Sequence, residues 1–96
     1  MRLFKTGLEV EWDDNKNTQN LQKHKIGFDM AALVFLDENR LEYYDEKHSV
    51  DEDRYIVIGC VEDVLFVVYT VREEAHRIIS ARLATQMEKE LYYGNC

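Results

Sequence analysis

The run from Val64 to Tyr69 constrains the fold of this 96-residue chain more than any other segment, because every position in it is apolar. A strand points successive side chains to opposite faces of a sheet, so an unbroken apolar run predicts a strand that is covered on both faces. A strand of this kind needs neighbours on both sides. The run therefore predicts the central strand of a sheet, with packing partners above and below it.

Three further segments predict the neighbours of this strand. Residues 54–61 precede it across a gap of two residues, Glu62 and Asp63, and such a gap between strand patterns is typical of a tight hairpin. Residues 76–82 follow it with alternating faces, and Leu41–Tyr44 predicts a short edge strand. Together these segments predict a small antiparallel sheet of three to four strands.

Helix signals surround the predicted sheet. Residues 8–12 alternate apolar and acidic side chains, which predicts a half-buried strand, and Asp13 or Asp14 then supplies an N-cap for a helix. The chain is thus predicted to form a single α+β domain over residues 1–96, with its sheet flanked by two N-terminal helices and a C-terminal helix. The expected helices extend from residue 14 to about residue 25, from Asp29 to Phe35, and from Ala84 to about Leu91.

Net charge separates one segment from the rest of the chain. The chain carries 12 Lys and Arg against 19 Asp and Glu, a formal charge of −7, and most of the excess lies between Asp37 and Asp53. Proteins that bind free RNA usually present an electropositive surface, so the whole-chain charge argues against RNA binding, whereas the near-neutral remainder does not. Residues 37–53, here called the acidic segment, are expected either to face a basic protein partner or to solubilise the fold.

Membrane, secretory and metal-binding signals are absent from the sequence. The longest apolar run is far shorter than the ~20 residues that cross a bilayer, and Met1 to Trp12 lack the apolar region of a secretory signal. The two cysteines and three histidines do not have the spacing of a metal site. The sequence therefore predicts a cytoplasmic protein with no membrane association, no metal site and no cofactor.

Four arginines in or beside the strand-rich half are candidates for binding phosphate: Arg54, Arg72, Arg77 and Arg82. A guanidinium group is planar and always charged, so it binds phosphate through two parallel hydrogen bonds and stabilises negative charge that develops on phosphorus. Arg77 and Arg82 differ by an odd number and face opposite sides of a regular strand, unless the strand ends or bulges near residues 80–82. The alternative is that each arginine pairs with a carboxylate.

Acid–base candidates are fewer. His24 and His48 are the candidate proton carriers, because imidazole titrates near neutral pH, and His24 belongs to the basic stretch Lys23-His24-Lys25 at a helix end. Glu88 in the last helix is either a carboxylate base or an ordinary solvated residue. A hydrogen-bonded structural histidine and cations that meet a helix dipole are the corresponding alternatives. Tyr92 and Tyr93, near the chain end, are the candidates for exposed rings that stack on bases.

Taken together, these residues resemble the BrnT toxins of bacterial type II toxin-antitoxin systems. The resemblance covers roughly Trp12 to Tyr92, and the stretch Arg77-Ile78-Ile79-Ser80-Ala81-Arg82 with the trailing Glu88 and Tyr92 is its most specific part. The other matching residues are Trp12-Asp13, Lys16, Asn20, Lys23-His24, Phe28, Ala31, Phe35, Asp37, Asp45, His48-Ser49, Glu52, Arg54-Tyr55, Gly59, Thr70, Arg72 and Ala84.

The resemblance implies a RelE-like fold and a metal-independent endoribonuclease that inhibits translation. It also implies a cognate BrnA-like antitoxin with a DNA-binding region, which neutralises the toxin. Operator DNA would be bound only through this antitoxin. The resemblance further suggests a dimer of toxins bridged by antitoxin. In such a reaction the RNA 2′-hydroxyl attacks the adjacent phosphodiester. Carried onto this sequence, the expected catalytic residues are Arg54, Arg77, Arg82, His48 and Glu88, and the expected RNA contacts are Lys23, His24, Arg72 and Tyr92.

A second hypothesis comes from a different class of protein. The chain would then be a non-catalytic, degenerate interaction module that binds a basic DNA-binding partner through the acidic segment. A pull-down of a small basic DNA-binding protein, combined with no growth arrest on expression, would favour this module over the enzyme.

Overall fold

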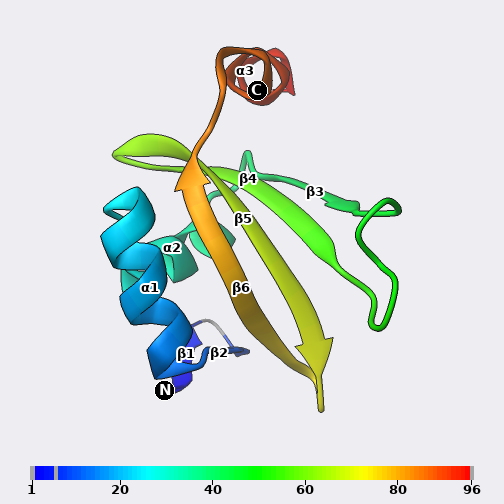
Figure 1. Cartoon of the computed structure of the whole chain (residues 1–96). Helices are drawn as coiled ribbons and strands as arrows, with labels where there is room; N and C mark the ends of the chain where they lie inside the picture. The colour runs from blue at the N-terminus through cyan, green and yellow to red at the C-terminus, as the bar shows by residue number, and fades with distance from the viewer. Residues whose placement is uncertain (1, 6, 96) are drawn as a thin grey trace.

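The computed structural model describes residues 2–5 and 7–95, and across them the chain forms one sheet of six strands (Figure 1). The strands lie in the order β1-β2-β6-β5-β4-β3. Their bounds are β1 Arg2–Lys5, β2 Leu8–Glu11, β3 Leu41–Tyr44, β4 Tyr55–Val61, β5 Asp63–Arg72 and β6 Ala75–Leu83. The helices are α1 Asp14–His24, α2 Phe28–Ala31, the 3₁₀ helix η1 Ala32–Leu36, and α3 Gln86–Asn95.

The apolar run of residues 64–69 lies in the interior of the sheet, as the sequence predicts. It forms most of β5, which pairs antiparallel with β4 on one side and with β6 on the other. Leu65, Val67 and Tyr69 enter one core cluster, and Val64, Phe66 and Val68 belong to or pack against a second. The prediction of a central strand is therefore confirmed, but its second face is only partly covered, because Phe66 and Val68 are half-buried.

The predicted sheet of three to four antiparallel strands is wrong, although the α+β class is correct. A hairpin of β1 and β2 precedes the helices, and β2 pairs parallel with β6 through Val10↔His76 and Glu11↔Arg77, so the sheet is mixed and larger. The helices α1 and α2 are consequently inserted after two strands rather than forming the N-terminus of the domain. The parallel pairing joins residues more than sixty positions apart, and local periodicity carries no signal for such a contact.

One face of the sheet, here called the closed face, is covered by α1, α2 and η1. Phe28 and Ala31 of α2 are fully buried against Val57 and Val67 of the central strands. Gly59 allows η1 to approach closely, because a Cβ atom at this position would lie 2.9 Å from the Cβ atom of Val34. This face therefore holds the larger of the two cores.

The opposite face, here called the open face, is covered over only part of its area. Its core cluster contains Ile56, Ile58 and Val64, together with Ala84 and Tyr92 from the C-terminal end of the chain. Figure 1 shows α3 beyond the C-terminal end of β6, so the helix reaches one end of the strands. The rest of the open face, towards the loop between β3 and β4, is where the candidate site lies.

A side chain from α1 replaces a neighbouring strand along the outer edge of β6. The pairing with β2 reaches Arg77, and further along the strand Asn20 takes over. Its Nδ2 atom donates to Ala81 O at 2.8 Å and to Ile26 O at 2.9 Å, and its Oδ1 atom accepts from Ala81 N at 3.1 Å. Asn20 is buried, and its amide satisfies backbone groups that an open edge would leave unpaired.

A bulge in β6 decides which way its arginines point. Tyr69 pairs with Ile78 and Val68 pairs with Ser80, which leaves Ile79 as an extra residue. Arg77 lies opposite Thr70, and Arg82 lies opposite Phe66. Thr70 and Phe66 are four positions apart on a regular strand, so both arginines face the same side of the sheet. The bulge at Ile79, directly before residues 80–82, is the irregularity that this common orientation requires.

Candidate active site

A pocket of about 400 Å³ opens on the open face, between β6, β5 and the loop that joins β3 to β4. It combines an apolar floor from the central strands with cationic and titratable groups around it. This open-face pocket is lined by Asp45, Lys47, His48, Arg54, Ile56, Phe66, Val68, Ile79, Ser80 and Arg82. Three of the five residues predicted to be catalytic, His48, Arg54 and Arg82, therefore line one pocket.

The loop of residues 45–54 holds His48 and Arg54 in place. Asp45 N donates to Arg54 O at 2.8 Å, which extends the pairing of β3 with β4 by one residue. Ser49 closes the loop, because its hydroxyl donates to Asp45 O at 2.6 Å and accepts from Arg54 N at 2.9 Å. The Nδ1 atom of His48 lies 3.1 Å and 3.0 Å from the two carboxylate oxygens of Asp45.

Arg54 is the unpaired arginine of the pocket. Among the described residues, no carboxylate lies within ion-pair distance of its guanidinium group, although its backbone is bonded to Asp45 and Ser49. A guanidinium group that is not already neutralised retains its full capacity to bind an anion. The geometry therefore makes Arg54 the cation that is ready to receive a phosphate.

Arg82, in contrast, already binds a carboxylate. Its Nη1 and Nη2 atoms donate to the two oxygens of Glu88 at 2.8 Å and 3.0 Å, and its guanidinium carbon lies 4.0 Å from the centre of the Phe66 ring. Hydrogen bonds from Arg82 lower the pKa of Glu88, and the same contact raises the pKa of Arg82. Both groups therefore stay charged near neutral pH, and Glu88 is a weak proton acceptor in this arrangement.

Glu88 also takes part in capping the start of the last helix, α3. Its Oε1 atom accepts from Thr85 N at 2.8 Å, and Glu88 N donates to the Thr85 hydroxyl at 3.2 Å. These reciprocal bonds form a capping box at the start of α3. One carboxylate thus joins the pocket arginine to the position of the C-terminal helix.

Arg77 and Arg72 lie outside the pocket, and each binds a carboxylate. Arg77 Nη1 lies 2.7 Å from Glu11 Oε2. The backbone of Arg77 is about 13 Å from that of Arg82 along the strand. Arg72 Nη2 lies 3.0 Å from Glu52 Oε2 near the end of β5. For these two arginines the structure shows the arrangement given above as the alternative, pairing with an acid.

Two smaller depressions share lining residues with the pocket. A depression of about 250 Å³ beside α1 shares Ile79 and Ser80 with the pocket, and one of about 330 Å³ under the loop shares Lys47, His48 and Arg54. The three together are here called the groove. The depression beside α1 is lined by Lys16, Gln19, Asn20, Lys23, His24, Ile79 and Ser80, and the other by Lys47, His48, Val50, Asp51, Glu52 and Arg54. The predicted RNA contacts Lys23 and His24 thus line a depression that shares Ile79 and Ser80 with the pocket of His48 and Arg54.

The groove is more basic than the chain as a whole. Its lining contains five lysines and arginines against three carboxylates, and two histidines add to the positive side when protonated. The groove cations are Lys16, Lys23, Lys47, Arg54 and Arg82, and the acids are Asp45, Asp51 and Glu52. The net charge of −7 therefore does not describe the surface where a phosphate would bind.

Tyr92 is not an exposed ring. It is 4% exposed and packs in the open-face core, and its hydroxyl donates to Asp37 Oδ2 at 2.5 Å. Burial of Asp37 works to raise the pKa of its carboxyl, but the bonds from Tyr92 and from the Cys60 and Asn39 amides outweigh it and lower the pKa. The expectation of an exposed ring is confirmed for Tyr93 and wrong for Tyr92.

Sequence reasoning did not assign several lining residues of the groove to the site, among them Lys16, Asp45, Lys47 and Ser80. Lys16 is seven residues before Lys23, a spacing that places both on one helix face, and this signal was available in the sequence. Lys47 directly precedes His48, and Ser80 lies two residues before Arg82, but no sequence pattern marks either of them as a site residue. Their place in the groove depends on the loop geometry and on the bulge at Ile79.

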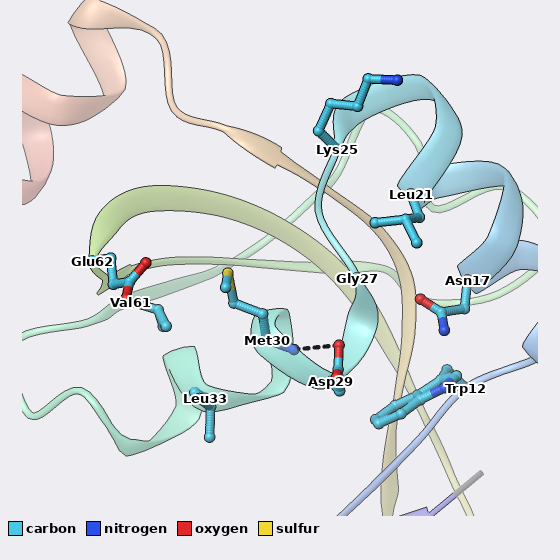
Figure 2. Close-up of a pocket in the computed structure, with 10 residues that line it drawn as sticks. All are labelled: Trp12, Asn17, Leu21, Lys25, Gly27, Asp29, Met30, Leu33, Val61 and Glu62. Atoms are coloured by element: carbon cyan, nitrogen blue, oxygen red, sulfur yellow. Dashed lines mark hydrogen bonds between the residues drawn. The ribbon is translucent and has the colours of Figure 1, made fainter.

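A larger pocket, about 740 Å³, lies elsewhere (Figure 2). It is formed between α1, α2 and the end of β4, and Trp12, Leu21, Met30, Leu33 and Val61 supply its apolar walls. The carboxylate of Asp29 already accepts a hydrogen bond from the neighbouring backbone, since Met30 N donates to its Oδ1 atom at 2.9 Å. The lining contains no histidine or arginine, so the combination of groups that phosphate chemistry requires is found in the smaller open-face pocket.

The fold and the pocket define a class: a small α+β protein that presents a histidine and an unpaired arginine in a pocket on the open face of its sheet. Within this class, the family model for the ribonuclease toxin BrnT of type II toxin-antitoxin systems matches residues 12–88, and the chain belongs to that family. The family is one of ribonuclease toxins, which implies an RNA substrate and an antitoxin partner.

A solved structure supports the same assignment. The chain is similar to the crystal structure of the Brucella abortus ribonuclease toxin BrnT, with 27% sequence identity and a TM-score of 0.63, and the match covers 80% of this chain and 96% of that chain. No curated protein sequence matches the chain. Among the described residues, no helix is long and apolar enough to span a membrane.

Proposed function

We propose that this chain is an endoribonuclease toxin that cleaves RNA by attack of the 2′-hydroxyl on the adjacent phosphodiester, without a metal ion. The observation that carries the proposal is the open-face pocket, in which His48 and the unpaired Arg54 lie beside Arg82. A proton carrier and two guanidinium groups are the chemical groups that this reaction needs. Family membership supports the ribonuclease activity, and the pocket supports the assignment of residues.

His48 is proposed to accept the proton that leaves the RNA 2′-hydroxyl. The 2′-oxygen forms a bond to phosphorus while its proton passes to the imidazole, and the bond from phosphorus to the 5′-oxygen then breaks. Arg54 binds the non-bridging oxygens, where negative charge increases in the transition state. Among the described residues, no group of three His, Cys, Asp or Glu side chains is arranged to hold a metal ion, so the proposal assigns charge neutralisation to arginine.

Arg82 and Glu88 are proposed to act as a unit. Arg82 adds positive charge to the pocket, and Glu88 orients its guanidinium group through two hydrogen bonds rather than serving as the base. Arg77 is proposed to hold β2 to β6 through Glu11. A catalytic role for Arg77 and RNA contacts by Arg72 and Tyr92 stay predictions, and Tyr92 would have to leave the core to stack on a base.

RNA on both sides of the cleaved bond is proposed to follow the groove. Lys16, Lys23 and His24 would contact phosphates on one side, and Lys47 on the other. Single-stranded RNA fits a groove of this kind, because it exposes its phosphates and can bend between successive contacts. Inhibition of translation and neutralisation by a BrnA-like antitoxin complete the proposed function.

A cleavage assay tests the proposal. The purified chain, free of antitoxin, should cleave a single-stranded RNA oligonucleotide in the presence of EDTA. Arg54→Ala should lower kcat by about 10²-fold to 10³-fold, because removal of one stabiliser of transition-state charge costs ~2.7 to 4 kcal/mol. Arg40→Ala is the matched control, since Arg40 binds Glu42 away from the groove.

Two results would contradict the proposal. Cleavage by Arg54→Ala at the wild-type rate would remove Arg54 from the site, and cleavage that requires an added metal would remove the metal-independent mechanism. The same assay decides the place of the other arginines. Arg82→Ala should lower the rate of RNA cleavage more than tenfold. A comparable fall in Arg77→Ala would show that Arg77 belongs to the site despite its bond to Glu11.

The interaction module is not favoured by the structure of the acidic segment. Five of its eight carboxylates make side-chain bonds within the chain, so the segment is less available to a partner than its sequence indicates. These carboxylates are Asp37, Glu42, Asp45, Glu52 and Asp53, and their partners include Tyr92, Arg40, His48, Arg72 and Tyr44.

A further inference from the structure

The candidate proton carrier has a carboxylate against one of its two ring nitrogens. His48 Nδ1 lies 3.0 Å and 3.1 Å from the oxygens of Asp45, and the side chain of Asp45 is 12% exposed against 60% for His48. Among the described residues, the hydrogen bonds of the imidazole are those of Nδ1 to Asp45. The carboxylate therefore distinguishes the two nitrogens, and Nε2 is left facing away from Asp45.

Asp45 is held in this position by the backbone around it. Its own amide donates to Arg54 O at 2.8 Å, and its carbonyl oxygen accepts from the Ser49 hydroxyl at 2.6 Å. Its Oδ1 atom also accepts from His48 N at 3.3 Å, so the carboxylate binds both the backbone and the ring of the same residue. These bonds place the carboxylate before any substrate arrives.

An ionised carboxylate accepts hydrogen bonds and cannot donate them. The neutral imidazole must therefore carry its proton on Nδ1 to bond to Asp45, and this leaves the lone pair on Nε2. We propose that Asp45 is a positioning residue that fixes this tautomer, so that Nε2 of His48 is the base that removes the proton from the RNA 2′-hydroxyl. This inference rests on the proposed ribonuclease function and adds the atom that acts and the residue that selects it.

The proton balance follows from this arrangement. Nε2 takes the proton of the 2′-hydroxyl as the bond from the 2′-oxygen to phosphorus forms, and the 5′-oxygen leaves with a proton from water. The imidazolium that results keeps its Nδ1 proton directed at Asp45, whose negative charge now faces a positive ring. Asp45 itself takes up no proton, and His48 returns its proton to water.

Asp45→Asn is the variant that tests the inference. The carboxamide keeps an oxygen at the Oδ1 position that can accept from His48 N, and its NH₂ group takes the Oδ2 position, 3.0 Å from Nδ1. An NH₂ group there favours Nδ1 as an acceptor, which shifts the proton to Nε2. We expect kcat to fall by about tenfold to 10²-fold with little change in KM. Glu46→Gln is the matched control, because it removes one negative charge from an exposed position in the same loop.

A spectroscopic measurement tests the tautomer without relying on activity. Nitrogen-15 NMR of the imidazole groups, above their titration range, should show His48 protonated on Nδ1 in the wild type and on Nε2 in Asp45→Asn. The His48 signals are identified by their loss in His48→Gln. The wild-type spectrum needs no variant other than this marker, so poor folding of Asp45→Asn would not prevent the test.

The possible outcomes distinguish a failure of the role of Asp45 from a failure of the proposed ribonuclease function. A wild-type His48 that carries its proton on Nε2, or an Asp45→Asn chain that cleaves RNA at the wild-type rate, would overturn the role of Asp45. A wild-type chain with the Nδ1 tautomer that cleaves no RNA would instead overturn the proposed function. The Nδ1 tautomer together with a loss of kcat in Asp45→Asn, absent in Glu46→Gln, supports both.

Discussion

The two faces of the sheet are built from the same strands and serve different purposes. On the closed face, three helical segments bury Val57, Val67 and Ala81 completely. On the open face, α3 reaches the end near Ile58 and Val64, and the remainder carries the open-face pocket with His48, Arg54 and Arg82. Because the closed face holds the larger core, we expect it to supply most of the stability, which allows the open face to keep charged groups beside apolar strands. Substitutions on the two faces should therefore have separable effects.

The largest effect on stability is expected on the closed face. Phe28 is fully buried and packs edge-on against Trp12, with their ring centres 6.4 Å apart. Phe28→Ala should lower the free energy of unfolding by about 3 to 5 kcal/mol, because it removes a large buried side chain and leaves a cavity. Urea denaturation measures the loss, and Met30→Ala, at an exposed position in the same helix, should cost far less. Equal losses in both variants would contradict the division between the faces.

Removal of the edge amide is expected to rank second. Asn20→Ala leaves Ala81 N, Ala81 O and Ile26 O without the partner that each has in the native structure. The expected cost is about 2 to 3 kcal/mol, since unsatisfied buried groups are expensive even when water reaches some of them. Denaturation of Gln19→Ala, which removes an exposed amide from the same helix, provides the comparison. A loss in Asn20→Ala no larger than in Gln19→Ala would show that the edge contributes nothing.

The ion pair between Arg82 and Glu88 is expected to contribute less to the free energy of unfolding, and its contribution should disappear in acid. The bonds from Arg82 hold the pKa of Glu88 below its ordinary value of 4.5, so the folded chain binds that proton less readily than the unfolded chain. The stabilisation is therefore complete above pH 4.5 and is lost as the pH falls through the lower, folded value. Glu88→Gln should cost about 1 kcal/mol at pH 7 and almost nothing at the acid end of the titration. A cost that does not change with pH would contradict this account.

The smallest effect concerns the outer part of the groove. Lys23→Ala should leave the free energy of unfolding within about 0.5 kcal/mol of the wild type. It should weaken RNA binding and reduce the slope of log K against log salt concentration by about 0.7, because one phosphate contact to a single strand is lost. Binding titrations at several salt concentrations measure the slope, with Lys89→Ala on α3 as the control. An unchanged slope would place the RNA outside the depression beside α1.

Local pattern predicted the elements of this fold better than their partners. The apolar run of β5 and the gap after β4 predicted a hairpin that the structure contains, and the N-cap oxygen of Asp13 accepts from Lys16 N as expected. The parallel pairing of β2 with β6 was missed, because nothing within either segment specifies a partner so distant along the chain. The second helix proved to be one α-helical turn that continues as a 3₁₀ helix, which brings η1 against Gly59.

The site shows the same division. Residue chemistry selected His48, Arg54 and Arg82, and the structure brings them to one pocket. Regular alternation would have separated Arg77 from Arg82, and a bulge at Ile79 that no residue pattern specifies puts them on one face. Pairing with acids could be named as an alternative but not assigned, since Glu11 reaches Arg77 only through the parallel strands.

The amide of Asn20 also limits how another polypeptide can recognise this molecule. A chain that binds by adding a strand needs a row of unpaired backbone groups, and at Ala81 these groups are already bonded to a side chain. In the described part of the sheet, the outermost strands are β1 and β3. Strand β3 ends at Tyr44, directly before Asp45. A strand added there would extend the sheet up to the loop that carries His48, while the edge of β6 beside the groove remains closed by α1.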